Sequence, residues 1–224
     1  MGFLEEVLYP PACIACEQPG DWVCGSCLKT IPLFSDPLPA PPLPSGRPLA
    51  LERLFAMAPY ASSSWSTLIT AIKYESLTEA EPSVCSQLHA YHQALTWPWP
   101  FGDGRGWALV PVPTNPDHVE TRGGDHLDLW IRALQSLLPA ADVRRDLLFR
   151  HSGTRAHASL LTPGAREAEM EQSVQATGAV PAQILLLDDV YTTGATMQAC
   201  ARALKDAGAH TVEAFVGAAS FSPR

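Results

Sequence analysis

The sequence has little positive charge and no long apolar segment. Lysine and arginine together number 15, against 23 aspartate and glutamate residues, which gives a formal net charge of −8 at pH 7. A molecule with this net charge repels nucleic acid as a whole, so any DNA contact requires a local basic patch. No apolar run approaches the roughly 20 residues that a helix needs to cross a bilayer. We therefore expect no membrane span and no generally basic nucleic-acid-binding surface.

The sequence also lacks a recognisable signal peptide and an internal repeat. Residues 1–11 contain no basic segment, and Glu5 and Glu6 interrupt their apolar character. We therefore expect a cytoplasmic protein, and in the cytosol disulfides are rare. With 224 residues and 46% hydrophobic content, the chain can form one sizeable core and a small appendage.

Two closely spaced cysteine pairs lie near the start of the chain. Cys13 and Cys16 form one pair, Cys24 and Cys27 form the other, and seven residues separate the pairs. Two such pairs can bring four thiolates together around Zn²⁺, and the metal would hold together a segment too short to bury a core. Two disulfides, a redox function or an iron–sulfur cluster are the alternatives. We predict a structural zinc module.

A proline-rich stretch separates this module from the rest of the chain. Residues 32–48 contain seven prolines, a composition that favours an extended connector. The predicted units are thus a zinc module (1–31), a linker (32–48) and a main domain (49–224). In the main domain, strands and helices alternate, which predicts a largely parallel α/β sheet. We expect strands at 54–60, 107–112, 184–187 and 211–219, helices at 65–74, 83–95, 127–138 and 197–207, and a mobile or partly helical excursion at 144–180.

The segment 184–196 carries the clearest functional signal, and it reads Ile-Leu-Leu-Leu-Asp-Asp-Val-Tyr-Thr-Thr-Gly-Ala-Thr. Four apolar residues predict a buried strand with Asp188 and Asp189 at its carboxyl end. A small-residue turn then leads into a helix, whose first N–H groups have no intrahelical partner and favour a phosphate. Carboxylates suit ribose hydroxyls, or a hydrated Mg²⁺ carried by a pyrophosphate. The pattern predicts a sugar-phosphate site; the alternative is a strand–turn–helix whose aspartates cap the helix.

This segment resembles the phosphoribosyl-pyrophosphate (PRPP) motif of type I phosphoribosyltransferases. The resemblance implies an α/β fold of that type, with a mostly parallel sheet and flanking helices, and PRPP bound together with Mg²⁺. It also implies that Asp188 and Asp189 contact the ribose hydroxyls. The 5′-phosphate would be bound by Thr192, Thr193, Gly194, Ala195 and Thr196.

The order of features along the chain narrows the resemblance to the ComF family of competence proteins. The matching features are Tyr9-Pro10-Pro11-Ala12-Cys13, the two cysteine pairs, Ala71-Ile72-Lys73-Tyr74, Val110-Pro111-Val112-Pro113, Arg122-Gly123 and the segment 188–196. Where that family has Arg-Gly-Phe-Asn-Gln, this chain has Arg122-Gly123-Gly124-Asp125-His126. By resemblance, pyrophosphate or substrate contacts are expected at Lys73, Val112, Pro113, Thr114 and Arg122.

The family resemblance implies a role in natural transformation. The protein would bind PRPP or a related sugar phosphate and assist the uptake or processing of transforming single-stranded DNA, beside a DNA-uptake helicase. The alternatives are an active Mg²⁺-dependent phosphoribosyltransferase of nucleotide salvage and a PRPP sensor without catalysis. The candidate patch for DNA contains Arg144, Arg145, Arg150, Arg155 and His157, for which an ordinary solvated surface is the alternative.

Overall fold

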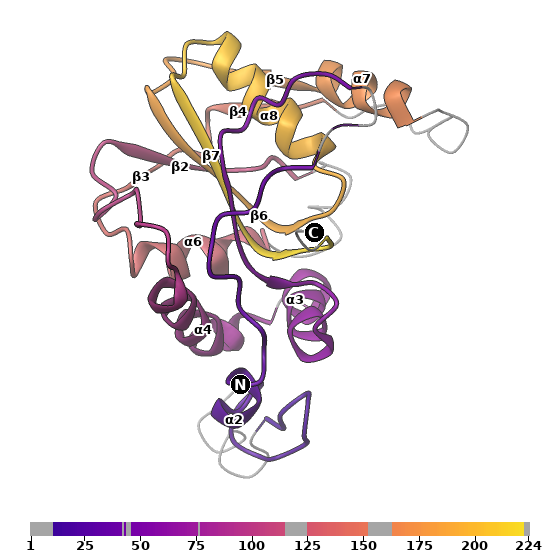
Figure 1. Ribbon diagram of the computed structural model, residues 1–224, viewed down its shortest axis with the longest axis vertical. Helices are drawn as coiled ribbons and strands as arrows, with labels where there is room; N and C mark the ends of the chain where they lie inside the picture. Colours follow the sequence, from indigo (N-terminus) through magenta and orange to yellow (C-terminus); the bar gives the residue numbers. More distant parts are fainter. Residues whose placement is uncertain are drawn as a thin grey trace.

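A parallel five-stranded sheet with helices on both faces forms the centre of the molecule (Figure 1). The computed structural model describes residues 11–41, 43, 46–75, 77–114, 125–151 and 163–221. All neighbouring strands in this sheet run parallel. The expected α/β class is therefore confirmed. Across the sheet, the strands lie in the order β1 (Leu54–Pro59), β7 (Thr211–Ala219), β6 (Gln183–Tyr191), β2 (Trp107–Pro111) and β3 (Asp142–Val143).

The strands send alternate side chains into two hydrophobic cores. On β6, Leu185 and Leu187 belong to one core, and Ile184 and Leu186 belong to the other. Because helices cover both faces, β6 is apolar at consecutive positions, as buried parallel strands usually are. None of the helices in the described part of the chain has the length and apolarity of a membrane span. The first core is covered by α3 (Ser63–Glu75), α4 (Glu81–Ala94) and α6 (Leu127–Gln135), and the second by α8 (Ala195–Asp206).

The strand β6 is longer than the sequence predicts, and this changes the position of the acidic pair. We expected Asp188 and Asp189 after the end of the strand, but β6 continues to Tyr191. Its pairing with β7 persists past the acids, because Asp188 is in register with Val216. Val216 belongs to the core under α8, so the register places Asp188 on that face. Asp189 consequently lies on the face of α3 and α6.

The remaining expected strands and helices are present, with ends that differ by a few residues. The segment 144–180 contains regular structure in the part that the structure describes. There β4 (Leu148–Arg150) pairs antiparallel with β5 (Val174–Ala176), and α7 (Pro163–Ser173) precedes β5. The side chains of Leu148 and Val174 join the core beside α8. Thr196 Oγ1 lies 3.7 Å from Met170 Sδ, so α7 reaches the first turn of α8. A short 3₁₀ turn, η1 (Thr78–Ala80), connects α3 to α4.

The N-terminal cysteine segment packs beside α4, and it contains the short helix α2 (Gly25–Leu28) (Figure 1). Cys13, Val23 and Leu28 belong to the same core as α4. The proline-rich stretch then contacts the first strand of the main sheet, where the backbone N–H of Leu38 donates to the Leu54 carbonyl at 2.8 Å. The two segments therefore share apolar contacts and a backbone hydrogen bond with the main domain.

Two tryptophans fix the helices that border the acidic pair. Trp65 of α3 donates its indole N–H to the carbonyl oxygen of Gly217 on β7 at 2.8 Å. The Trp65 ring meets Trp130 of α6 edge to face, with ring centroids 6.1 Å apart. A Cβ atom at Gly217 would lie 2.2 Å from Trp130, so only glycine leaves room for this packing. These contacts hold α3 and α6 against the sheet.

Candidate functional site

A cavity of about 230 Å³ lies at the carboxyl end of β6. Its walls are formed by Lys73 from α3 and by the continuous segment 188–197, which runs from β6 into the first turn of α8. The structure thus brings together one predicted cation, both predicted acids and the whole predicted phosphate turn. Ligand sites in open α/β sheets commonly lie at this edge.

The turn before α8 is shaped by a single glycine. Gly194 is the residue that precedes α8, and its φ of 78° lies in the left-handed region. A Cβ atom there would lie 1.9 Å from the hydroxyl oxygen of Tyr191, which is buried beneath the turn. The Gly194 carbonyl accepts the first helical hydrogen bond, from Gln198 N–H at 2.8 Å. Glycine is therefore required both by the backbone conformation and by the buried tyrosine.

The first turn of α8 presents backbone donors and no negative charge. It contains no acidic residue, and no side chain within the described residues caps its N terminus. Ala195 N–H makes one weak contact within the turn, with Thr193 Oγ1 at 3.4 Å. A helix N terminus carries partial positive charge, which favours an anion. The turn and its threonine hydroxyls can thus bind a phosphate group.

The carboxylate of Asp188 lies at the cavity wall. Its Oδ1 accepts a hydrogen bond from Asp189 N–H at 2.9 Å. Burial and then the charge of Asp189 raise the pKa of Asp188 to about 8, and Lys73 offsets only part of this increase. An acid with this pKa can accept from or donate to a sugar hydroxyl near neutral pH.

Asp189 is enclosed by partners of its own. Its side chain is 2% exposed, and Oδ2 lies 2.7 Å from Lys73 Nζ and 3.5 Å from His126 Nε2. Its Oδ1 accepts the N–H of Val190 at 2.8 Å. Burial lowers the pKa of Lys73, but the Asp189 carboxylate outweighs this and keeps the pKa above its ordinary value. Lys73 is therefore a permanently charged cation at the cavity wall.

His126 is the neighbour of the site that the sequence did not reveal. It immediately precedes α6, and its side chain is 8% exposed. Its only sequence signal was its place in the segment that departs from the ComF pattern. His126, Asp188 and Asp189 each place one ligand atom within 4.8 Å of the other two, a set that can hold a metal ion. A divalent cation on Asp189 would, however, meet the ammonium of Lys73 there and be repelled by it.

The other residues predicted to contact the substrate do not line the cavity in the part of the chain that the structure describes. Val112, Pro113 and Thr114 follow β2, and Val112 N–H donates to Leu187 O of β6 at 2.9 Å. They lie at the same edge of the sheet but, among the described residues, they are not part of the cavity wall. Arg122 lies outside the described residues.

The candidate basic patch is largely neutralised within the described chain. Arg144 forms a two-bond contact with Asp146, at 2.8 Å for each bond. Arg145 pairs with Asp125 and with Asp128. Arg155 and His157 lie outside the described residues. Four aspartates, among them Asp142 near Arg144, thus surround two of the arginines, which favours a solvated ion-pair network over a free cationic surface.

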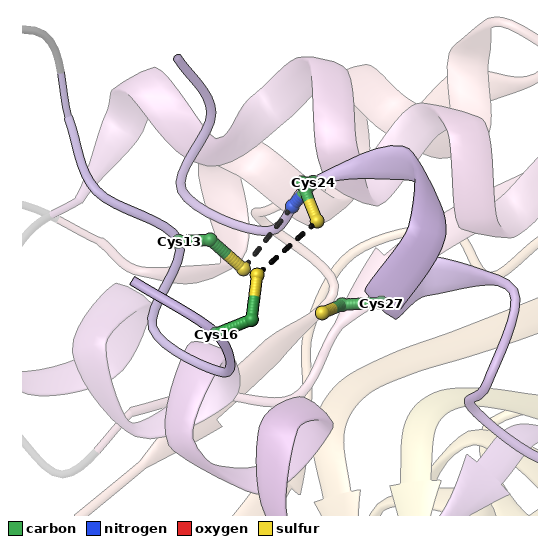
Figure 2. A group of neighbouring side chains, drawn as sticks. All are labelled: Cys13, Cys16, Cys24 and Cys27. Atoms are coloured by element: carbon green, nitrogen blue, oxygen red, sulfur yellow. Dashed lines mark hydrogen bonds between the residues drawn. The ribbon is translucent and has the colours of Figure 1, made fainter. Parts of the chain in front are cut away.

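The four N-terminal cysteines converge on one point (Figure 2). Their sulfur atoms all lie within 4.8 Å of one another, and the Cys16 and Cys24 sulfurs are 3.6 Å apart. Four ligands at the usual Zn–S length in a tetrahedron are about 3.8 Å apart, whereas a disulfide requires about 2.05 Å. Four mutually close sulfurs suit one tetrahedral ion better than two separate bridges. The cluster can therefore bind a structural zinc ion, as the sequence predicts.

The pKa values of two thiols in the cysteine cluster show how the protein and a bound cation would share the stabilisation of thiolates. Burial opposes ionisation of Cys13, but backbone N–H groups, first that of Cys24 at 3.4 Å, lower its pKa to about 6. Contacts with the Cys16 and Cys24 thiols raise the pKa of Cys27 to about 12. The protein itself thus favours the thiolate form of Cys13, and a bound divalent cation would favour the thiolate form of its ligands as well.

The fold and its two sites define an α/β protein with a strand–turn–helix cavity and an N-terminal four-cysteine cluster. No family model matches the chain. Among curated proteins, it is similar to "Competence protein ComFC" of Streptococcus pneumoniae (strain ATCC BAA-255 / R6), with 29% identity over 109 residues. The match covers 49% of this chain and 46% of that relative, so it spans about half of the relative's length. This similarity supports assignment of the chain to the ComF family.

Proposed function

We propose that this protein binds PRPP or a related sugar phosphate and acts in natural transformation, in the handling of incoming single-stranded DNA. The cavity formed by Lys73 and residues 188–197 is the observation that carries the proposal. The turn would bind the 5′-phosphate through backbone N–H groups, and the acidic pair would serve the pentose. Mg²⁺ would enter with the pyrophosphate of PRPP and neutralise its charge.

The competence role is supported by the similarity to Competence protein ComFC. The net charge of −8 and the ion-paired arginines oppose strong direct binding of DNA. The proposal therefore assigns DNA contact chiefly to a partner, such as a DNA-uptake helicase, with the sugar-phosphate site as the part contributed by this chain.

Calorimetry with the full chain tests the ligand. At pH 9, above the pKa of Asp188, we expect saturable binding of ribose 5-phosphate and PRPP. Binding of both should be at least about tenfold weaker after Asp188→Asn, which at this pH removes a charged acceptor at nearly constant shape. Lys205→Gln is the control, because its ion pair with Glu52 lies at the far end of α8 from the cavity. Absence of binding to either compound, or unchanged affinity in Asp188→Asn, would contradict the site assignment.

Deletion and complementation test the cellular role. A strain lacking the gene should lose transformation by added DNA, and the wild-type gene should restore it. The Asp188→Asn gene should fail to restore it although its product is folded and present at normal levels. Full transformation in the deletion strain would reject the proposed role.

An active phosphoribosyltransferase is the second candidate. The observation in its favour is that a cation and a carboxylate lie at one cavity beside the phosphate turn, where a leaving pyrophosphate and a pentose can both be held. Incubation with PRPP, Mg²⁺ and a panel of nucleobases, with pyrophosphate release as the readout, separates the two. Turnover with a natural base establishes the enzyme, and binding without release supports the non-catalytic role.

A further inference from the structure

The two aspartates of the acidic pair have different surroundings. Asp188 lies on the α8 face of β6 and borders the cavity with a partly exposed side chain. Asp189 is 2% exposed and faces Lys73 and His126. The difference follows from the extension of β6, because consecutive residues of a strand point to opposite faces.

Both carboxylate oxygens of Asp189 face groups of the protein itself. One carboxylate oxygen accepts the Val190 N–H at 2.8 Å, and the other lies 2.7 Å from Lys73 Nζ. His126 covers the same oxygen at 3.5 Å. Asp189 is part of the segment that lines the cavity, but an exposed fraction of 2% leaves its side chain little surface for a ribose hydroxyl.

Lys73 has the opposite character, because it keeps free capacity toward the cavity. Its side chain is 29% exposed and forms part of the cavity wall. An ammonium group has three donors, so the contact with Asp189 leaves others for a ligand. A lysine side chain is flexible, and holding it in place before binding reduces the entropy that a ligand must otherwise overcome.

We propose that Asp189 is a positioning residue, which holds the Lys73 ammonium toward the cavity, while Asp188 alone receives the sugar hydroxyls. Lys73 then binds a second anionic group of the ligand, away from the phosphate held by residues 192–196. The preferred ligand class is a pentose phosphate with a phosphate or pyrophosphate at its other end. This inference rests on the proposed function.

Two ligands distinguish the roles of the two acids. Ribose 5-phosphate lacks the second anionic group and PRPP has it, so the ratio of their dissociation constants reports the contribution of Lys73. Lys73→Gln and Asp189→Asn should each reduce the preference for PRPP by about tenfold, the scale of a charge-assisted hydrogen bond, and leave ribose 5-phosphate nearly unaffected. Asp188→Asn should weaken both ligands alike and keep the ratio. The double variant Lys73→Gln with Asp189→Asn should lose no more than Lys73→Gln alone.

Several outcomes would overturn the inference while leaving the proposed function intact. If Asp189→Asn weakened both ligands as Asp188→Asn does, Asp189 would touch the sugar itself. If it changed neither, it would have no role in the site. Lys205→Gln, which breaks an ion pair of similar length (2.9 Å) outside the cavity, should change neither affinity nor ratio.

A measurement without ligand tests the positioning role separately. The chain has only three lysines, Lys29, Lys73 and Lys205, so NMR signals of the side-chain ammonium groups can be assigned by single Lys→Arg variants. We expect a slowly exchanging Lys73 ammonium signal in the free protein, which Asp189→Asn removes. A Lys73 signal that exchanges as fast as that of exposed Lys29 would refute the positioning role, even if the protein bound neither sugar phosphate.

Discussion

The cysteine cluster and the cavity at the end of β6 arrange their polar groups in opposite ways. In the cluster, four sulfurs face one another, and the surrounding side chains join a core shared with α4. In the cavity, backbone donors and a carboxylate face open space of about 230 Å³. The first arrangement suits an ion that its ligands enclose, and the second leaves space that an exchanging ligand could occupy.

The two sites should therefore affect the stability of the folded state with opposite signs. A structural metal that joins ligands from a small segment contributes its binding free energy to the folded state. An open ligand site carries unsatisfied donors and a carboxylate with a raised pKa, which lower stability until the ligand binds. The predictions below test this contrast, beginning with the largest expected effect.

Removal of the metal ligands should have the largest effect on stability. Cys24→Ser should abolish stoichiometric zinc and lower the free energy of unfolding by about 3 kcal/mol or more, since structural zinc sites contribute on the order of 10 kcal/mol. Metal analysis and urea unfolding measure both quantities. Cys85→Ser is the matched control, because Cys85 is partly buried on α4 and is not part of the four-cysteine cluster. Equal free energies of unfolding for Cys24→Ser and Cys85→Ser would contradict a structural role for the cluster.

Substitution of Gly194 should affect binding more than stability. Gly194→Ala imposes the left-handed strain of about 1–2 kcal/mol and drives a methyl group into Tyr191, so the turn must move. We expect at least about tenfold weaker binding of ribose 5-phosphate by calorimetry. Gly208→Ala is the control, with a φ of 108° and no atom within 4 Å of the added carbon. The same loss of affinity in both variants would show that backbone strain, not the shape of the turn, controls binding.

The sequence could predict the parts of these sites that are local in the chain. Two Cys-x-x-Cys pairs and the segment 184–196 each contain their chemistry within a few residues, so spacing alone indicated both. The contact between Lys73 and Asp189 joins residues 116 positions apart, and it depends on the packing of α3 through Trp65. The extension of β6 through Asp189 depends on pairing with β7, which an acidic dipeptide does not suggest. His126 reaches the site through the same long-range packing, and its place in the segment that departs from the ComF pattern does not by itself indicate contact with Asp189.

The acidic pair should give a pH-dependent stability with a definite sign. Asp188 has a folded-state pKa of about 8, against 3.8 for a solvent-exposed aspartate such as that of the unfolded chain, so between these values the folded state retains a proton that the unfolded state has lost. The free energy of unfolding should therefore decrease as pH rises through this window. Urea unfolding from pH 5 to 8 should show a smaller decrease in Asp188→Asn, which cannot ionise.

The matched control for this prediction is Asp146→Asn. The hydrogen bond and charge of Arg144 lower the pKa of Asp146 to about 2, so Asp146 stays ionised in both states across pH 5–8. Its substitution should leave the slope unchanged in that range. A slope in Asp188→Asn as steep as in the wild type would mean that another group causes the pH dependence, and that the open site does not strain the fold in this way.

The smallest effect, on DNA affinity, is expected at the arginines near β3. Like the sulfurs of the cysteine cluster, their charged groups face other groups of the protein. Arg145 is held by Asp125 and Asp128, so little of its charge is available to a phosphate backbone. Arg145→Gln should change the affinity for single-stranded DNA by less than about twofold, and the salt dependence by less than one released counterion. Arg150→Gln is the comparison, because the described residues give Arg150 no ion pair. Fluorescence anisotropy at two salt concentrations measures both variants. A larger loss in Arg145→Gln than in Arg150→Gln would show that DNA displaces the aspartates, and that this region is an open site like the cavity.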